Sequence, residues 1–169
     1  EKTFLVGNIG VPLTAKSDEI NACSYPVAVT EVSSFQIETL SSFTPHIAAV
    51  LNVAPDHLDR HYTFENYKFL KKKLLANLRE SEYAVLNYDD EITRSFAENA
   101  RFKPVWFSTE SEVDGAYIKG DEAYFFGEKI FDFKNFALGG IHNKKNALAA
   151  IAVLKLLKVK NEDIAKAFS

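Results

Sequence analysis

Residues 47–53 read Ile-Ala-Ala-Val-Leu-Asn-Val, a run in which apolar side chains follow one another without alternation. Such a run is typical of a strand that is covered on both faces, as in a parallel sheet. Residues 83–87 repeat this character, and residues 27–29 and 105–107 are shorter versions of it. Helical patterns separate these runs at residues 63–78 and 89–99. The alternation predicts an α/β fold in which these strands share one mostly parallel sheet flanked by helices.

Residues 113–133 have a different pattern. Three short apolar runs are separated by glycines, at 116–118, 123–126 and 129–133. This spacing predicts a small antiparallel meander attached to a face or an edge of the α/β body. The apolar stripe in residues 142–157 predicts one last helix.

The composition excludes several classes of protein. The chain has 169 residues, of which 47% are hydrophobic and 25% are charged, so it can build a real core and is neither disordered nor collagen-like. A net charge of -3 argues against a nucleic-acid partner. No apolar run is long enough to span a bilayer. The single cysteine, Cys23, cannot form an internal disulfide, so we expect a reducing, cytoplasmic location.

Polar residues follow two of the predicted strands. Glu31 comes after residues 27–29, and His57 comes after residues 47–53. Ligands of open parallel sheets gather beyond the carboxyl ends of the strands, so these two side chains could share a metal ion or a substrate. Two simpler interpretations stay open: Glu31 could be a carboxylate at a helix N-terminus, and His57 could be an ordinary loop histidine.

His57 and His61 have the spacing HxxxH, with Asp59 between them. On a helix this spacing would place both imidazoles on one face, as in some zinc sites. It leaves open a metal-dependent hydrolase that uses Glu31, His57, Asp59 and His61.

Lys71 has an unusual position in the predicted helix. At about 100° per residue it falls within the apolar stripe, whereas Lys68, Lys72 and Lys73 point elsewhere. A lysine on an inward face is costly unless it has a partner or loses its charge. Lys71 is therefore either a lysine whose head group reaches solvent at the edge of the stripe or a functional residue. The stripe consists of Phe64, Tyr67, Leu70, Leu74, Leu75 and Leu78.

Residues 139–146 (GGIHNKKN) open the last helix. Asn143 could cap that helix. Asn143 and Asn146 are three residues apart and can point the same way, which suits the edge of an adenine base. A capped helix without a ligand is the simpler alternative.

Residues 7–10 (GNIG) alone indicate only a turn.

Taken in order, five motifs resemble the central domain of the Mur ligases of peptidoglycan synthesis. They are GNIG (7–10), EVSSFQIE (31–38), LNVAPDHLDRH (51–61), NYDD (87–90) and GIHNKKNALAA (140–150), and Lys71 has the spacing of the family's lysine. EVSSFQ, with Phe35, is most similar to the family member that adds D-glutamate. The resemblance implies an ATP-dependent amide ligase that joins D-glutamate to UDP-MurNAc-L-Ala through an acyl phosphate.

The resemblance also implies roles for individual residues. Glu31 and His57 would each ligate a magnesium ion, and Lys71 matches the lysine that the family carries as a carbamate. His57 and Lys71 would act in catalysis. Contacts with the muramoyl substrate would come from Asn8, Ser33 and Gln36, and contacts on the adenine side of ATP from His142, Asn143 and Asn146.

The sequence departs from the family pattern in two respects: the phosphate loop is missing, and the chain stops near the end of the central domain. Residues 1–169 contain no GxxxxGK[ST] phosphate loop, and the chain begins at Glu1 rather than Met. We interpret residues 1–169 as a partial central domain, without the N-terminal UDP-binding and C-terminal domains, and expect this fragment alone to be inactive. A non-catalytic binding module on the ligase scaffold is the alternative.

Overall fold

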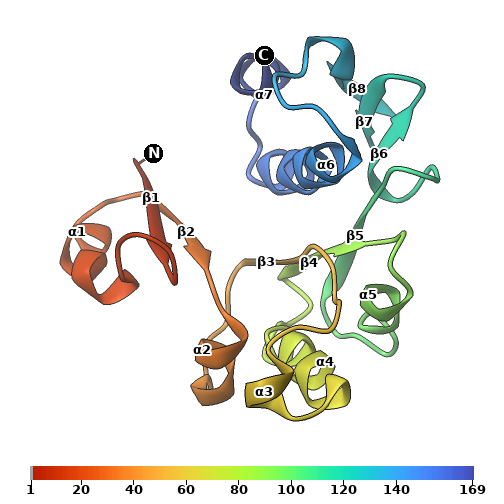
Figure 1. The fold of residues 1–169 in the computed structure, drawn as a ribbon. Helices are drawn as coiled ribbons and strands as arrows, with labels where there is room; N and C mark the ends of the chain where they lie inside the picture. Colours follow the sequence, from red (N-terminus) through yellow and green to blue (C-terminus); the bar gives the residue numbers. More distant parts are fainter. Residues whose placement is uncertain (1) are drawn as a thin grey trace. The chain divides into compact units, whose positions relative to one another are not determined.

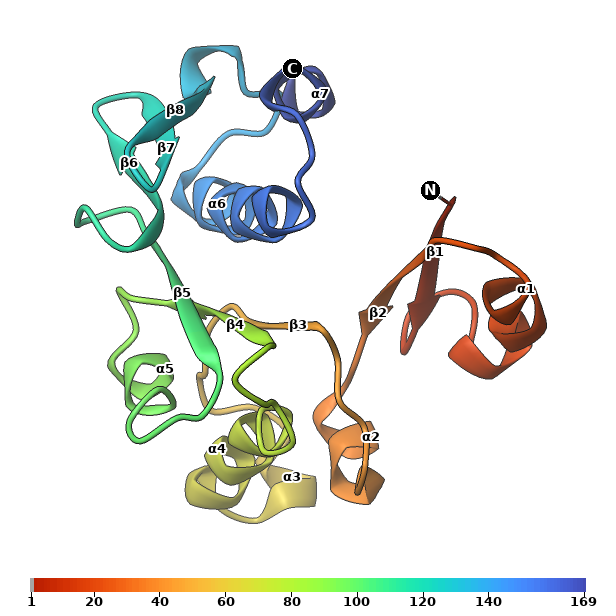
Figure 2. The same ribbon diagram turned by 180° about the vertical axis from the view of Figure 1, so that it is seen from behind.

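The computed structural model describes residues 2–169 in two units. The first ends at Ser41, and the second is Ser42–Ser169. Figures 1 and 2 show the elements of each unit from opposite sides.

The first unit contains a parallel pair of strands, β1 (Lys2–Gly7) and β2 (Pro26–Glu31). The connection holds a short 3-10 helix, η1 (Leu13–Lys16), and α1 (Ser17–Asn21); α2 (Ser34–Thr39) follows β2. Gly7 pairs with Glu31 at a φ of +122°, and a Cβ atom on Gly7 would lie 2.1 Å from the Glu31 carbonyl oxygen. Only glycine therefore lets the two strands pair to their ends.

The second unit contains a six-stranded sheet in the order β3-β4-β5-β6-β7-β8. The strands from β3 to β6 run parallel, and β6, β7 and β8 are antiparallel neighbours. Their bounds are β3 (Ile47–Val50), β4 (Tyr83–Asn87), β5 (Lys103–Ser108), β6 (Gly115–Lys119), β7 (Glu122–Phe125) and β8 (Glu128–Asp132).

Helices cover both faces of the parallel part of this sheet (Figures 1 and 2). Val85 packs into one apolar cluster with α6, whereas its neighbours Ala84 and Leu86 pack into the other with α4. Because successive side chains of a strand point to opposite faces, burial on both sides requires the unbroken apolar run of β4. The helical elements are α3 (Leu58–His61), α4 (Phe64–Lys73), α5 (Glu91–Ser95), η2 (Phe133–Asn135), α6 (Ile141–Leu156) and α7 (Asn161–Phe168).

The predicted α/β class is confirmed, but the prediction of one shared sheet is wrong. Residues 27–29 lie in β2, which pairs with β1, whereas β3 pairs with β4 in the other sheet. The segment Lys2–Gly7, which the sequence patterns did not single out, supplies the parallel partner of β2. The antiparallel meander is confirmed, and it extends the sheet edge because β6 pairs with β5.

Several predicted elements are shorter than their sequence patterns. β3 ends at Val50 because side chains replace the strand ladder beyond it. The Asn87 amide donates to the Leu51 carbonyl at 2.9 Å, and the Val53 N–H donates to Asp90 at 2.9 Å. The helices predicted at 63–78 and 89–99 end at Lys73 and Ser95, and residues beyond them form turns. Among residues 2–169, no helix has the length and apolar character of a membrane span.

Candidate functional site

The first group of predicted site residues lies at the carboxyl ends of β1 and β2. The Asn8 backbone N–H donates to the Glu31 carbonyl at 2.8 Å, and the Asn8 side-chain amide lies 3.5 Å from the Glu31 carboxylate. Glu31 is exposed and forms no ion pair with any described residue. The turn that begins at Gly7 thus places an amide donor beside an open carboxylate.

Ser33 and Gln36 together begin α2. The Ser33 hydroxyl accepts from the Gln36 backbone N–H at 3.3 Å, and the Gln36 side-chain oxygen accepts from the Ser33 N–H at 2.9 Å. This capping box satisfies backbone donors that a helix start leaves unpaired. The side-chain NH₂ of Gln36 takes no part in it and is the group that a ligand could use.

His57 adopts a left-handed backbone conformation, with φ 50° and ψ 35°, immediately before α3. Its backbone N–H donates to the Asp56 carboxylate at 2.8 Å, and its Nε2 lies 3.5 Å from the other carboxylate oxygen. The side chain is 48% exposed. Few residues other than glycine adopt this conformation, and histidine is among those that do so more often; Tyr62, Asn99, Phe126 and Lys158 also have positive φ here.

A chain of packed side chains attaches the His57 loop to the helix that carries Lys71. His61, three per cent exposed, lies with its ring centre 5.6 Å from that of Tyr67. The Asn66 side chain also donates to the His61 carbonyl at 3.1 Å. Lys71 is partly buried, and its Nζ lies 5.4 Å from the centre of the Tyr67 ring. Tyr67 of the predicted stripe is buried, but Lys71 is no more buried than Lys68 and Lys73, so burial does not set Lys71 apart on α4.

The hydrolase alternative is not supported by this geometry. His57 lies outside the helix in the left-handed conformation, and His61 is buried against Tyr67, so the HxxxH spacing does not present two imidazoles on one surface. Asp59 is exposed on α3. Within residues 2–169, no three or more His, Cys, Asp or Glu side chains gather as a metal site would require.

The third group lies at the start of α6. Gly140, at a φ of +91°, occupies the cap position, and the Asn143 side-chain NH₂ donates back to the Gly139 carbonyl at 2.7 Å. The prediction that Asn143 caps the helix is therefore wrong, because the helix begins earlier, at Ile141. His142 and Asn146 are exposed in the first two turns.

A buried carboxylate anchors this end of α6. The Asp89 side chain is 2% exposed and lies 3.1 Å from Lys145 Nζ. It also accepts from the Ser108 hydroxyl, from the Thr109 N–H at 3.0 Å and from the Thr109 hydroxyl at 2.8 Å. Burial by itself raises the pKa of Asp89, but these hydrogen bonds outweigh burial and hold the pKa below its ordinary value. The sequence patterns did not single out this network, although Asp89 lies in the motif NYDD.

Comparisons with known proteins all point to the same family. Residues 5–154 match the family described as Mur ligase middle domain. A UDP-N-acetylmuramoylalanine–D-glutamate ligase of Thermoanaerobacter sp. is 43% identical over 97% of this chain and 37% of its own length. The enzyme of the same name from Streptococcus equi subsp. zooepidemicus is 39% identical over 100% of this chain and 37% of its own. The chain thus spans little more than a third of these relatives.

Solved structures share the fold. A UDP-N-acetylmuramoyl-L-alanyl-D-glutamate–2,6-diaminopimelate ligase superposes with a TM-score of 0.71 and 17% identity, over 98% of this chain and 45% of that one. The MurF ligase from Thermotoga maritima, solved in complex with ADP, has a TM-score of 0.62 and 16% identity, over 97% of this chain and 47% of that one.

Proposed function

The chain belongs to the Mur ligase middle-domain family, and from that premise we propose that it is part of an ATP-dependent ligase that adds D-glutamate to UDP-MurNAc-L-Ala. The observation that carries this proposal is the 43% identity, over nearly the whole chain, to a relative with that name. Taken one by one, the side chains of Glu31, His57, Lys71 and the first turns of α6 have chemistry that this reaction can use. Since ATP and nucleotide-linked sugars are cytoplasmic metabolites, we propose that the reaction takes place in the cytoplasm.

The proposed reaction has two steps. The terminal carboxylate of UDP-MurNAc-L-Ala attacks the γ-phosphorus of ATP, ADP leaves, and an acyl phosphate forms. The amine of D-glutamate then attacks the acyl carbonyl, the tetrahedral intermediate expels phosphate, and the nitrogen loses a proton as the amide forms. Both steps bring anions together, so catalysis depends on positioning and on charge neutralisation.

Glu31 has the chemistry expected of a magnesium ligand. Magnesium in enzymes that act on ATP is held by one or two carboxylates together with water and phosphate oxygens. An exposed carboxylate without a cation partner, next to the Asn8 amide, fits that requirement. When bound, magnesium neutralises the negative charge that develops on the phosphates. Asn8 would orient the Glu31 carboxylate through its side-chain amide, and we assign His57 to a second magnesium ion.

Lys71 would supply an oxygen ligand after modification. Its neutral amine adds to carbon dioxide and releases one proton, which gives an anionic carbamate with two oxygens. Lys71 is partly buried, with its Nζ 5.4 Å from the centre of the Tyr67 ring. The contacts from Tyr67 through His61 would hold Lys71 and the His57 loop in a fixed relation.

At the start of α6, Asn143 would serve as a hydrogen-bond acceptor. Its NH₂ group already donates to Gly139, which leaves its side-chain oxygen for the exocyclic amino group of adenine. His142 and Asn146 would complete the contacts with the base. Asp89 holds the next turn of this helix through Lys145.

We propose that the contacts with UDP-MurNAc-L-Ala come from Asn8, Ser33 and the NH₂ group of Gln36.

The test uses the full-length protein that contains these residues. Phosphate release is measured with ATP, Mg²⁺ and UDP-MurNAc-L-Ala, with D-glutamate, L-glutamate or meso-diaminopimelate as the amine. We expect release that depends on D-glutamate and yields an amide product identified by mass spectrometry. Release with another amino acid only, or none with D-glutamate, would contradict the proposed substrate.

A further inference from the structure

A cavity of about 480 Å³, which we call the β5 cavity, lies beside β5, between the end of β4 and the turn that joins β7 to β8. Trp106 of β5 lines it and packs with the apolar cluster that contains α4 residues. Its neighbours Val105 and Phe107 pack with α6. Because successive side chains of a strand point to opposite faces, the β5 cavity lies on the face of the sheet away from α6.

Aromatic side chains form much of the wall of the β5 cavity. Tyr88, Trp106, Tyr117 and Phe126 all line it. The ring centres of Tyr88 and Trp106 are 5.5 Å apart, and Phe126 is 56% exposed. The guanidinium carbon of Arg94 lies 5.3 Å from the centre of the Tyr88 ring. One ring of the wall therefore already lies against a guanidinium in this structure.

Backbone hydrogen bonds hold the lining segments together. The Trp106 N–H donates to the Asp114 carbonyl at 3.0 Å, and the Phe126 N–H donates to the Gly115 carbonyl at 2.9 Å. Gly115 is also the partner of Trp106 in the β5–β6 register. The strand, the loop before β6 and the β7–β8 turn are thus fixed as neighbours by the sheet itself.

The charges on the β5 cavity are negative. Of the described residues that line it, only Glu112 and Asp114 carry a charge. Glu112 pairs with Lys119 at 2.8 Å. Asp114 is exposed and forms no ion pair with any described residue. An aromatic cavity with one carboxylate that lacks a cation is therefore available to a ligand.

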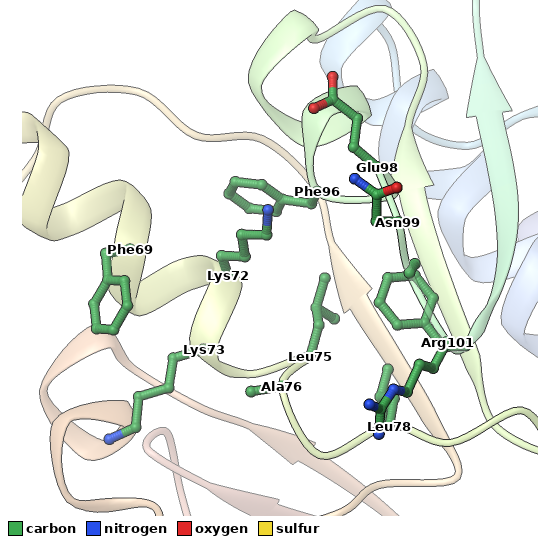
Figure 3. A pocket seen from close by; sticks show the side chains of 12 residues that line it. Phe69, Lys72, Lys73, Leu75, Ala76, Leu78, Phe96, Glu98, Asn99 and Arg101 are labelled. Carbon is green, nitrogen blue, oxygen red and sulfur yellow. The ribbon is translucent and has the colours of Figure 1, made fainter.

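Another cavity of this unit, of about 380 Å³, has the opposite charge and provides a comparison (Figure 3). Its charged lining side chains are Lys72, Lys73 and Arg101 with a single anion, Glu98. An organic cation should avoid this second cavity.

We propose that the β5 cavity binds a small monocation that carries a guanidinium group, with the group on the aromatic wall and Asp114 as the balancing carboxylate. A guanidinium is planar, is weakly hydrated and stacks on aromatic faces, whereas an ammonium is strongly hydrated. One carboxylate without a cation partner suits a single positive charge. This binding does not rest on the proposed ligase reaction.

The test titrates the full-length protein with Nα-acetyl-L-argininamide by isothermal titration calorimetry. Nα-acetyl-L-citrullinamide has nearly the same shape without the charge, and we expect it to bind at least about tenfold more weakly. Methylguanidinium identifies the source of the group. Equal affinity for it indicates a free guanidinium compound, and tighter binding of the argininamide indicates an arginine side chain of a peptide.

Two variants remove the two features separately. Asp114→Asn should weaken the argininamide about fivefold and leave the citrullinamide unchanged. Phe126→Asn should weaken the argininamide about threefold, because one ring of the wall is lost. Phe126 and Gly127 form the two-residue β7–β8 turn, both with positive φ, and asparagine is favoured at the first position of such a turn. Phe126→Asn should therefore stay folded, as circular dichroism can verify.

The matched control for charge is Glu110→Gln. Glu110 is exposed in the same loop before β6 but does not line the β5 cavity. Ala76→Trp is the control for place, because it fills the cavity of Figure 3 from an exposed position. Both variants should bind the argininamide as the parent protein does. Absence of argininamide binding, equal binding of the citrullinamide, or affinity unchanged in both Asp114→Asn and Phe126→Asn would overturn the proposal.

Discussion

The buried carboxylate of Asp89 lies 3.1 Å from the ammonium of the partly exposed Lys145, and this contact joins the end of β4 to the second turn of α6. Lys145 is flanked in sequence by the residues that we assign to adenine, so the pair fixes the part of α6 on which they stand. Such a contact stabilises the fold and positions the helix start at the same time.

Asp89→Asn should lower the free energy of unfolding by about 1–3 kcal/mol at pH 7, because the charge-assisted hydrogen bonds and the ion pair are lost. The folded-state pKa of Asp89 is below its ordinary value, so its ionised form favours the folded state. This contribution is complete above the unfolded-state pKa of about 3.9 and is lost as the pH falls through the lower folded-state pKa.

Urea unfolding at a series of pH values checks this expectation. The difference between the parent protein and Asp89→Asn should be constant from pH 7 to about pH 5 and shrink below about pH 3.9. Asp114→Asn, at an exposed position, is the control and should show little difference at any pH. A difference that stays constant through the acid range would argue against a stabilising ionised Asp89.

Gly7→Ala and Gly10→Ala should have very different effects, although both glycines have positive φ. At Gly7 a Cβ atom would lie 2.1 Å from the Glu31 carbonyl oxygen, so the end of the β1–β2 pair must open. At Gly10, with a φ of +78°, nothing lies within 4 Å, and only the strain of about 1–2 kcal/mol for a left-handed residue applies. Thermal unfolding of the two variants compares these costs, and equal costs would contradict the close approach at Gly7.

His57→Gly should be more stable than His57→Ala by about 1 kcal/mol, because glycine adopts the left-handed conformation without strain. Both variants should lose ligase activity in the full-length protein, since neither has an imidazole. Denaturant unfolding and phosphate release measured on the same preparations separate the two effects. Full activity in His57→Gly would exclude the proposed role of the side chain.

Lys71→Ala should reduce ligase activity of the full-length protein by several orders of magnitude, and added acetate or formate should restore part of it by replacing the missing oxygen ligand. Lys68→Ala is a close control. Lys68 lies 5.2 Å from the centre of the Phe64 ring, much as Lys71 lies over Tyr67, but it pairs with Glu65 at 2.6 Å. Its loss should leave activity near that of the parent protein.

Phosphate release with and without the small carboxylate measures this difference. If Lys71→Ala stays nearly as active as Lys68→Ala, Lys71 is a packing residue on Tyr67. Loss of activity in both variants to the same extent would likewise contradict a specific role for Lys71.

Much of the architecture could be predicted from local patterns. The strands β3, β4 and β5 were recognisable because strands buried on both faces need unbroken apolar runs. The burial of Tyr67 followed from the helical period, since every residue advances about 100° around α4, but the period did not separate Lys71 from Lys68 and Lys73. The order of the motifs also indicated the family, which the comparisons confirm.

Contacts between distant segments were decided only by the tertiary structure. β2 takes β1 as its neighbour, although η1 and α1 lie between them in the chain. The left-handed conformation of His57 was not predicted, because the residue type only raises the frequency of that conformation and does not determine it. Asp89 and Lys145 likewise meet only after β4 and α6 have packed. Local periodicity depends on the repeat of a single helix or strand, whereas these contacts depend on which elements become neighbours.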